Sequence, residues 1–395
     1  MRGAIVTILL LFCVGITTAQ ESGSVVIDVH AYDYSYTPID QSYNHMGDGG
    51  SGRSFLSPIP VGQDGYLSFL VIPAYTLETN FMLGAAATYT KYVAEQRVCD
   101  VSLSASGSIS GHYSVAVAGQ NYLTAGRNHR LTYGADILST PSRIWGLDYS
   151  SALASAYQKY TKKEYSAWLR YTLALGRFMA GAYVDYRHVA AANLDDAARH
   201  IFANQQLCVS TAGVGLSLAY DSRKSPAYTR GRYSGGVRGI YAMIESVYRP
   251  NALSNIAEDV VNLRALFDYY QPLWQGGMLA LDIYGEACSA QTPWLLMPQL
   301  GGDSRMRGYY AGRFRGNRLV SAQLELRQHI WNGIGAVAWG GGGMALSSDE
   351  TFHWRRVLPT YGVGLRYSYE QLTLRLDVAF GRGSNAIILG LNEAF

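Results

Sequence analysis

Hydrophobic and polar residues alternate one by one along several segments of the chain. The clearest segments are residues 164–176, 213–223, 319–330 and 372–380. Along the second of these, apolar Val214, Leu216 and Leu218 are separated by glycine and serine. Successive side chains of a β-strand point to opposite faces of the sheet, so each segment predicts a strand with one apolar face. Such strands recur from residue 66 onward with turn residues between them, and they predict an all-β protein.

The polar faces of these strands carry charges of both signs. Glu325 and Arg327 alternate with apolar residues in one segment, and Arg375 and Asp377 do so in another. A membrane-spanning barrel turns its apolar face to lipid and its polar face to the lumen. A soluble barrel or sandwich would give the same alternation with the two faces exchanged. Alternation alone therefore leaves both kinds of protein open.

Composition favours the membrane barrel. Only 15% of the 395 residues are charged, against roughly 25% in soluble domains. The chain holds 31 tyrosines and 43 glycines, and its mean hydropathy is −0.01. Beyond the first twenty residues there is no apolar run of about 18 residues, so a helical membrane protein is not expected. Many tyrosines and glycines, few charges and no long apolar run are typical of transmembrane barrels.

The first nineteen residues resemble a secretory signal peptide. Arg2 is followed by an apolar stretch from Ala4 to Ile16, and small residues end at Ala19. We therefore exclude residues 1–19 from the fold. Residues 20–65 are polar and rich in glycine, serine and aspartate, and they predict a short N-terminal periplasmic arm. Residues 66–395 remain for the barrel, which at about 10 residues per tilted strand plus loops suits about sixteen strands.

The last residues also point to the bacterial outer membrane. Phe395 falls on the same face as Leu391, Leu389 and Ile387 when the end of the chain is read as a strand. A terminal aromatic residue on an apolar strand face is the usual ending of bacterial outer-membrane barrels. Glu393 departs from the simplest form of that pattern. Together these features predict a transmembrane antiparallel β-barrel in the outer membrane of a Gram-negative bacterium.

One irregular stretch, residues 300–317, interrupts the strand pattern. It holds five glycines and four arginines in eighteen residues. Glycine allows backbone shapes that other residues disfavour, so the stretch predicts a shaped loop. Four guanidinium groups need partners, because neither lipid nor a dry core accepts an unpaired charge. A polar barrel lumen with acidic walls suits this loop, so we expect it to fold into the lumen.

Five short pieces, taken in order, resemble the family of the assembly barrels BamA and TamA, also called the bacterial surface antigen family. They are residues 72–79 with 84–85, 144–147, 213–216 with 220–223, 306–309, and 362–366 with 375–377. In this resemblance Arg307, Gly308 and Tyr309 form the tip of the long loop that enters the lumen. The resemblance implies a sixteen-stranded barrel whose first and last strands meet at a weak seam. Family members use that seam to pass or insert client proteins.

The residues of the first and last strands support a weak seam independently. Pro73 lies inside the first strand and cannot donate a hydrogen bond to a neighbouring strand. Gly381, Gly383 and Gly390 give the last two strands little side chain to pack. We therefore predict a seam formed by these residues and Phe395. The alternative is a kinked but closed corner of the barrel.

The sequence departs from the family in two ways. BamA and TamA carry periplasmic POTRA domains, whereas residues 20–65 leave no room for one, so we expect separate periplasmic or lipoprotein assembly factors. Second, the strand after Trp339 has only glycine where many relatives keep an acidic residue facing the loop arginine. Arg307 must then find another partner, and we predict Asp377 or Glu325, both expected to face inward. The alternative is that Arg307 sits in lumen water.

Other chemistry is weakly represented. His112 lies near Ser110 and Ser114, but no nucleophile–base–acid motif surrounds it. No cysteine or histidine spacing suggests a metal site, and nothing suggests a cofactor. The net charge of +3 gives no reason to expect nucleic acid. We therefore expect a non-enzymatic barrel in contact with outer-membrane lipid, which aids insertion or translocation of client barrel proteins. The alternatives are a passive channel and a scaffold barrel.

Overall fold

The fold is taken from a computed structural model. It describes residues 23–26, 59–62, 64–76, 80–93, 96–153, 156–223, 237–369, 372–391 and 393–395. The predicted signal peptide and most of the predicted arm lie outside these residues. Within them, no helix is both long enough and apolar enough to cross a membrane.

The described residues are mainly strands. The first nine are β1 (Gly23–Val26), β2 (Ile59–Val61), β3 (Gly65–Thr76), β4 (Asn80–Val93), β5 (Gln96–Ser108), β6 (Tyr113–Tyr122), β7 (His129–Ile144), β8 (Gln158–Leu175) and β9 (Phe178–Ala192). The next six are β10 (Cys208–Asp221), β11 (Gly239–Arg249), β12 (Val260–Trp274), β13 (Gly277–Cys288), β14 (Gln299–Leu300) and β15 (Phe314–Arg315). The last five are β16 (Arg318–Trp331), β17 (Ile334–Leu346), β18 (Leu358–Tyr369), β19 (Leu372–Gly381) and β20 (Ser384–Leu391).

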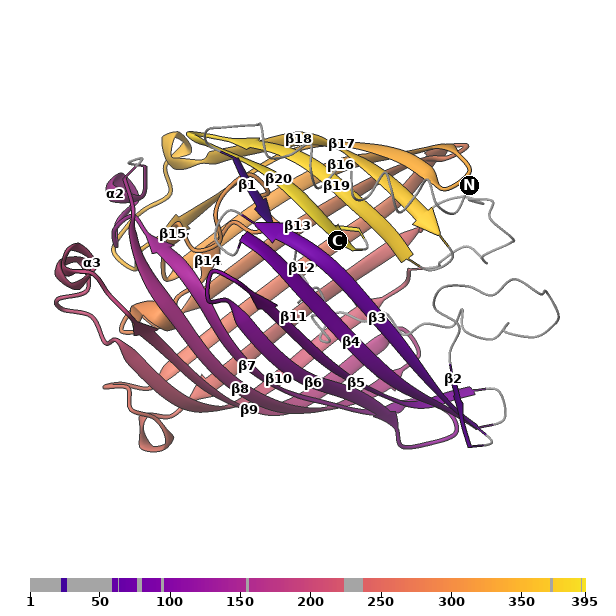
Figure 1. The fold of residues 1–395 in the computed structure, drawn as a ribbon. Coiled ribbons are helices and arrows are strands. Elements are labelled where there is room, and N and C mark those ends of the chain that lie inside the picture. Colours follow the sequence, from indigo (N-terminus) through magenta and orange to yellow (C-terminus); the bar gives the residue numbers. More distant parts are fainter. Residues whose placement is uncertain are drawn as a thin grey trace.

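Sixteen of the described strands follow one another around a barrel (Figure 1). They are β3 to β13 and β16 to β20, and each pairs antiparallel with the next. The predicted all-β barrel of about sixteen strands is thereby confirmed. Within the described residues, β20 and β3 do not pair with each other. The sheet is therefore open at the seam where its first and last strands meet.

Two further strands lie at the two sides of this seam. β1 pairs in parallel with β20, from Gly23 opposite Asn385 to Val26 opposite Ile388. β2 pairs antiparallel with the first three residues of β3, Gly65 to Leu67. β3 thus begins one residue before the predicted start of the barrel at 66. A four-residue parallel pairing is weaker than a long antiparallel ladder, so β1 adds only a short extension to the edge of β20 and leaves the seam open.

The predicted alternation of faces is also confirmed. On β10 the outward side chains of Val214, Leu216 and Leu218 are 52, 69 and 62% exposed. On β16 and β19 the inward side chains of Glu325 and Asp377 are fully buried. The apolar face is thus on the outside of the sheet and the charged face is inside. This arrangement is that of a membrane barrel, and it is opposite to that of a soluble one.

The connections between strands differ at the two ends of the barrel. The helices α2 (Tyr149–Leu153) and α3 (Asp196–Ile201) lie at one end, which we call the loop end (Figure 1). Short links such as 275–276 and 332–333 join strands at the other, the turn end. The longest connection of the loop end runs from β13 to β16 and carries the small β14–β15 hairpin.

Candidate functional site

The connection between β13 and β16 folds back against the inner wall, as predicted for residues 300–317. Leu300, Met306 and Tyr309 of this lumen loop are almost completely buried. They pack with the inward side chains of Leu319 on β16 and Leu358 on β18. The loop therefore fills part of the barrel with its own apolar core and is not suspended in lumen water.

Arg307 lies at the tip of the lumen loop and has no solvent exposure. Its Nη1 donates to Asp377 Oδ2 at 2.8 Å, and its Nη2 donates to Glu325 Oε2 at 2.5 Å. The structure thus brings Arg307 into contact with both predicted carboxylates, one on β16 and one on β19. Thr360 on β18 adds a hydrogen bond to the Arg307 carbonyl at 2.5 Å. A planar guanidinium group suits this bridging of two carboxylates because its donors point in fixed directions.

A third partner of Arg307 was not predicted from the sequence. The guanidinium carbon lies 3.7 Å from the centroid of the Trp339 ring on β17. Cations are attracted to the faces of aromatic rings, most strongly to that of tryptophan. Trp339 precedes the glycine run in which the sequence offered no acidic partner. β17 therefore contributes a stacked indole beside Arg307 in place of a carboxylate.

Two glycines on the inner face of β18 make room for these partners. A Cβ atom on Gly362 would lie 2.4 Å from the Trp339 ring, and one on Gly364 would lie 2.0 Å from Asp377 Oδ1. Neither contact is possible for a larger residue without displacing its neighbour. The glycines that resemble a family motif thus have a local reason, which is space for the side chains that receive Arg307.

The other two residues of the predicted loop motif fit closely against the last strands. Gly308 has φ +100°, and a Cβ there would lie 3.1 Å from the backbone of Phe380. Tyr309 donates its hydroxyl hydrogen to the Pro359 carbonyl at 2.7 Å and accepts from the Arg382 amide at 2.6 Å. Its ring lies over Gly381, where a Cβ would be 2.5 Å away. The tip of the loop is therefore bound to the end of β19 by shape as well as by charge.

The remaining loop arginines also have partners. Arg305 donates to both carboxylate oxygens of Asp282 on β13, at 3.1 and 3.0 Å. Arg313 donates to the Ala152 carbonyl of α2 at 2.8 Å, and Arg315 stacks on the Trp294 ring at 3.9 Å. The expectation that all four guanidinium groups need partners is met. Two find carboxylates on the wall, whereas the other two find carbonyls and aromatic rings at the loop end.

At the loop end, α2 contacts the lumen loop through Arg313. Asp148 precedes this helix and accepts hydrogen bonds from the Ser151 amide and from the Ser150 and Ser151 hydroxyls. These bonds lower the pKa of Asp148 to about 2. Arg313 joins the helix to the lumen loop and also donates to the Gly383 carbonyl between β19 and β20 at 3.1 Å. Arg313 thus links the lumen loop to α2 and to the turn between β19 and β20.

The predicted seam glycines have other local roles in the structure. Gly381 receives the Tyr309 ring, and Gly383 has φ +64° in the tight turn between β19 and β20. Gly390 faces Arg375, whose Nη2 would lie 3.0 Å from a Cβ at that position. The backbone of Pro73 pairs with Leu83 of β4. The open seam itself is seen in the strand pairing, and a role for these three glycines in it stays a prediction.

Phe395 differs from the sequence expectation. It was expected to continue the outer face of the last strand, but β20 ends at Leu391. Its ring lies 5.1 Å from the Arg327 guanidinium and packs with buried Tyr270 and Met278 on the inner side of β12 and β13. The chain therefore turns inward after β20. The expectation that Phe395 continues the outer face of β20 is therefore not met, because the backbone leaves the strand before reaching it.

The lumen wall formed by β8, β9 and β11 has charged residues of its own. Across β8, β9 and β11, Arg170 pairs with Glu245 at 2.6 Å and Arg187 with Glu164 at 2.7 Å. His112, considered above beside Ser110 and Ser114, bonds to Ser106 at 3.0 Å and to Thr140 at 3.0 Å. Such hydrogen bonds satisfy polar groups on a buried wall.

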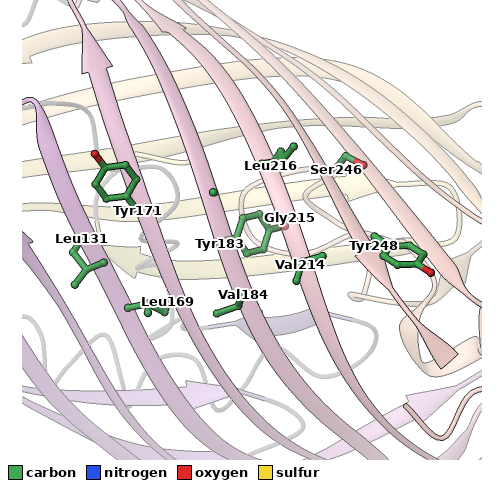
Figure 2. Close-up of a pocket in the computed structure, with 11 residues that line it drawn as sticks. Leu131, Leu169, Tyr171, Tyr183, Val184, Val214, Gly215, Leu216, Ser246 and Tyr248 are labelled. Atoms are coloured by element: carbon green, nitrogen blue, oxygen red, sulfur yellow. The ribbon is translucent and has the colours of Figure 1, made fainter. Parts of the chain in front are cut away.

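A shallow groove of about 610 Å³ crosses the wall strands β7 to β11 (Figure 2). Leu169, Val184 and Leu216 line it, and the short side chains of Ala182 and Ser246 leave it hollow. None of its lining residues is charged. An apolar groove on this wall suits contact with lipid.

Comparison with known proteins supports the fold. No family model and no curated protein matches the sequence. Among solved structures, the chain is similar to BamA from Haemophilus ducreyi lacking POTRA domains 1–3, with TM-score 0.56 and 14% identity over 82% of this chain and 69% of that one. It is also similar to CdiB from Escherichia coli, with TM-score 0.56 and 14% identity over 82% of this chain and 60% of that one.

A third similar structure is CdiB from Acinetobacter baumannii, with TM-score 0.50 and 11% identity. It is matched over 80% of this chain and 62% of its own, so the chain spans less than two thirds of either CdiB. At these identities the likeness is one of fold. The predicted resemblance to the BamA type of barrel is confirmed at that level, and the chain has the fold of a BamA- or CdiB-like transmembrane barrel.

Proposed function

We propose that this chain is an outer-membrane barrel that aids the insertion or translocation of client proteins, together with separate periplasmic or lipoprotein partners. The observation that carries the proposal is the open seam. Among the described residues, β3 pairs along its whole length with β4, whereas on its other side only Gly65 to Leu67 pair, with β2. An unpaired strand edge is a template for another strand. The similarity to BamA and CdiB folds supports the same role.

The lumen loop supports this role over that of a passive channel. It is fixed to the inner wall from β13 to β19 through Asp282, Glu325 and Asp377. A loop held in this way obstructs the lumen, whereas a channel for solutes needs open space. The proposed role is mechanical and involves no catalytic step. A planar-bilayer recording should then give small, flickering currents, and a large steady pore would favour the channel.

Crosslinking at the seam tests the proposal directly. A photo-reactive amino acid at Val71, which lies on the outer face of β3 and is 62% exposed, should capture unfolded outer-membrane proteins in growing cells. The same group at Val214, also a valine and 52% exposed on β10, serves as the matched control and should contact lipid only. Depletion of the chain should also lower the amounts of other outer-membrane barrels. Equal capture at both positions together with unchanged barrel levels would reject the role.

A further inference from the structure

Six charged side chains form a closed ring around the tip of the lumen loop. Arg307 contacts Glu325 and Asp377, as described above. Glu325 also accepts from Arg327 Nε at 2.6 Å, and Asp377 accepts from Arg366 Nη1 at 2.5 Å. Glu393 then joins the two outer arginines, at 2.7 Å from Arg366 Nε and 3.9 Å from Arg327 Nε. The members, in order, are Arg307, Glu325, Arg327, Glu393, Arg366 and Asp377.

Cations and anions alternate around this ring, and its formal charge is zero. Glu325 and Asp377 are fully buried, and the side chains of Arg366 and Arg327 are only 4 and 9% exposed. Glu393 is the most exposed member, at 31%. Charges removed from water need opposite charges close by. Each member therefore depends on both of its neighbours.

Glu393 belongs to the inward-turned end of the chain. Ala394 beside it is buried, and Arg327 Nη2 donates to the main-chain oxygen of Phe395 at 2.8 Å. The same arginine thus holds both the carboxylate of Glu393 and the backbone of the last residue. We call residues 393–395 the C-terminal tail. It begins within two residues of the end of β20, the strand at the seam.

We propose that Glu393 is a positioning residue that closes the ionic ring, so that docking of the C-terminal tail and docking of the lumen loop stabilise each other. Arg307 and Glu393 do not need to touch, because Glu325 with Arg327 and Asp377 with Arg366 connect them along two sides. Movement of β20 at the seam would pull the tail, weaken the ring and loosen the loop.

Thiol labelling of the tail tests the coupling in one direction. The four cysteines Cys13, Cys99, Cys208 and Cys288 are first replaced by serine. Ala394→Cys then reports on the tail in the purified full-length chain in detergent. Labelling should be slow in this background. Arg307→Ala, a change in the loop, should speed labelling at position 394 by about fivefold or more, which is the range of ordinary coupling between sites. Fast labelling without that change would mean that the tail is not docked.

The coupling is also measured in the other direction, from the tail to the loop. This direction uses a mild substitution at the tail, so misfolding does not decide the result. Met306→Cys reports on the loop tip, and Glu393→Gln alters only the most exposed member of the ring while preserving its shape. Labelling at 306 should rise by a similar factor. The matched control is Asp259→Asn, another carboxylate-to-amide change, at a position at the loop end that bonds to Tyr248; it should leave labelling at 306 unchanged. Unchanged labelling in Glu393→Gln, with heat-modifiable mobility retained, would overturn the inference.

Discussion

The guanidinium group of Arg307 lies 3.7 Å from the centre of the Trp339 ring while donating to two carboxylates at its edge. A flat cation is thus covered on one face by an indole and bound in its plane by Glu325 and Asp377. The planar geometry of arginine allows both kinds of contact at once, whereas a lysine ammonium provides a single point of charge. This combination fixes the lumen loop to three different strands of the wall.

Replacing Arg307 should weaken the barrel strongly. Arg307→Ala removes one partner from each of two buried carboxylates, and breaking a buried ion pair in this way costs about 3–5 kcal/mol. Arg307→Lys should cost less because the charge remains, but it cannot bridge both carboxylates. The loss of stability is measured as a shift in the midpoint of urea unfolding, which is monitored through heat-modifiable gel mobility. Arg355→Ala, a change at an exposed arginine on the loop before β18, is the control, and an equal effect there would contradict the account.

The space left by Gly364 on the inner face of β18 gives a second prediction. Gly364→Ala would place a methyl group against Asp377 Oδ1 and the Leu376 carbonyl, so Asp377 would have to move away from Arg307. Overpacking of this kind costs about 1–3 kcal/mol. Gly340→Ala is the matched control, because nothing lies within 4 Å of its Cβ position. The two variants should differ clearly in their unfolding midpoints, and the prediction fails if they behave alike.

Tyr309 offers a test of the loop's hydrogen bonding alone. Tyr309→Phe keeps the ring over Gly381 but removes the hydroxyl that bonds to the Pro359 carbonyl and the Arg382 amide. Leaving buried groups without partners costs about 1–3 kcal/mol. Amide exchange measured by mass spectrometry should therefore speed up in the segment around Arg382. Unaltered exchange there would show that the hydroxyl is not needed to order the turn.

The open seam predicts uneven protection from hydrogen exchange. β7 and β8 are joined over sixteen residue pairs, from His129 opposite Leu173 to Ile144 opposite Gln158. β3 and β20 lack such a partner on one side within the described residues. Their amides should therefore exchange faster than those of β8, because local opening requires fewer broken bonds. Equal protection in β3, β20 and β8 would indicate a barrel that is closed in the membrane.

Much of the fold could be predicted from the sequence because the strand pattern is local. Alternation places Glu325 and Asp377 on the inner face without knowledge of any neighbouring strand, and the arginine-rich loop needs carboxylates. Trp339 could not be assigned in this way. Its place beside Arg307 depends on the register of β17 with β18, where Trp339 is opposite Gly362. The only hint in the sequence was the pair Gly362 and Gly364, whose missing side chains leave space for large neighbours.

The inward turn of the C-terminal tail was not predictable from alternation either. A periodic pattern indicates which face a residue occupies only while the backbone stays in the strand. The chain leaves the ladder after Leu391, so the position of Phe395 is set by its contacts with Arg327 and Tyr270. The one sequence signal was Glu393, a charge where an apolar or neutral residue was expected. Its partners Arg366 and Arg327 explain that departure.

A crosslink between the lumen loop and the inner wall would show whether the loop is docked there. In a background without native cysteines, Met306→Cys is combined with Gly343→Cys on β17, where a Cβ would lie 2.9 Å from the Met306 sulfur. A docked loop should form this disulfide in intact outer membranes, whereas Met306→Cys with outward-facing Gly340→Cys should give none. Failure of the first pair to crosslink, or equal crosslinking by both pairs, would mean that the loop is not docked against the wall.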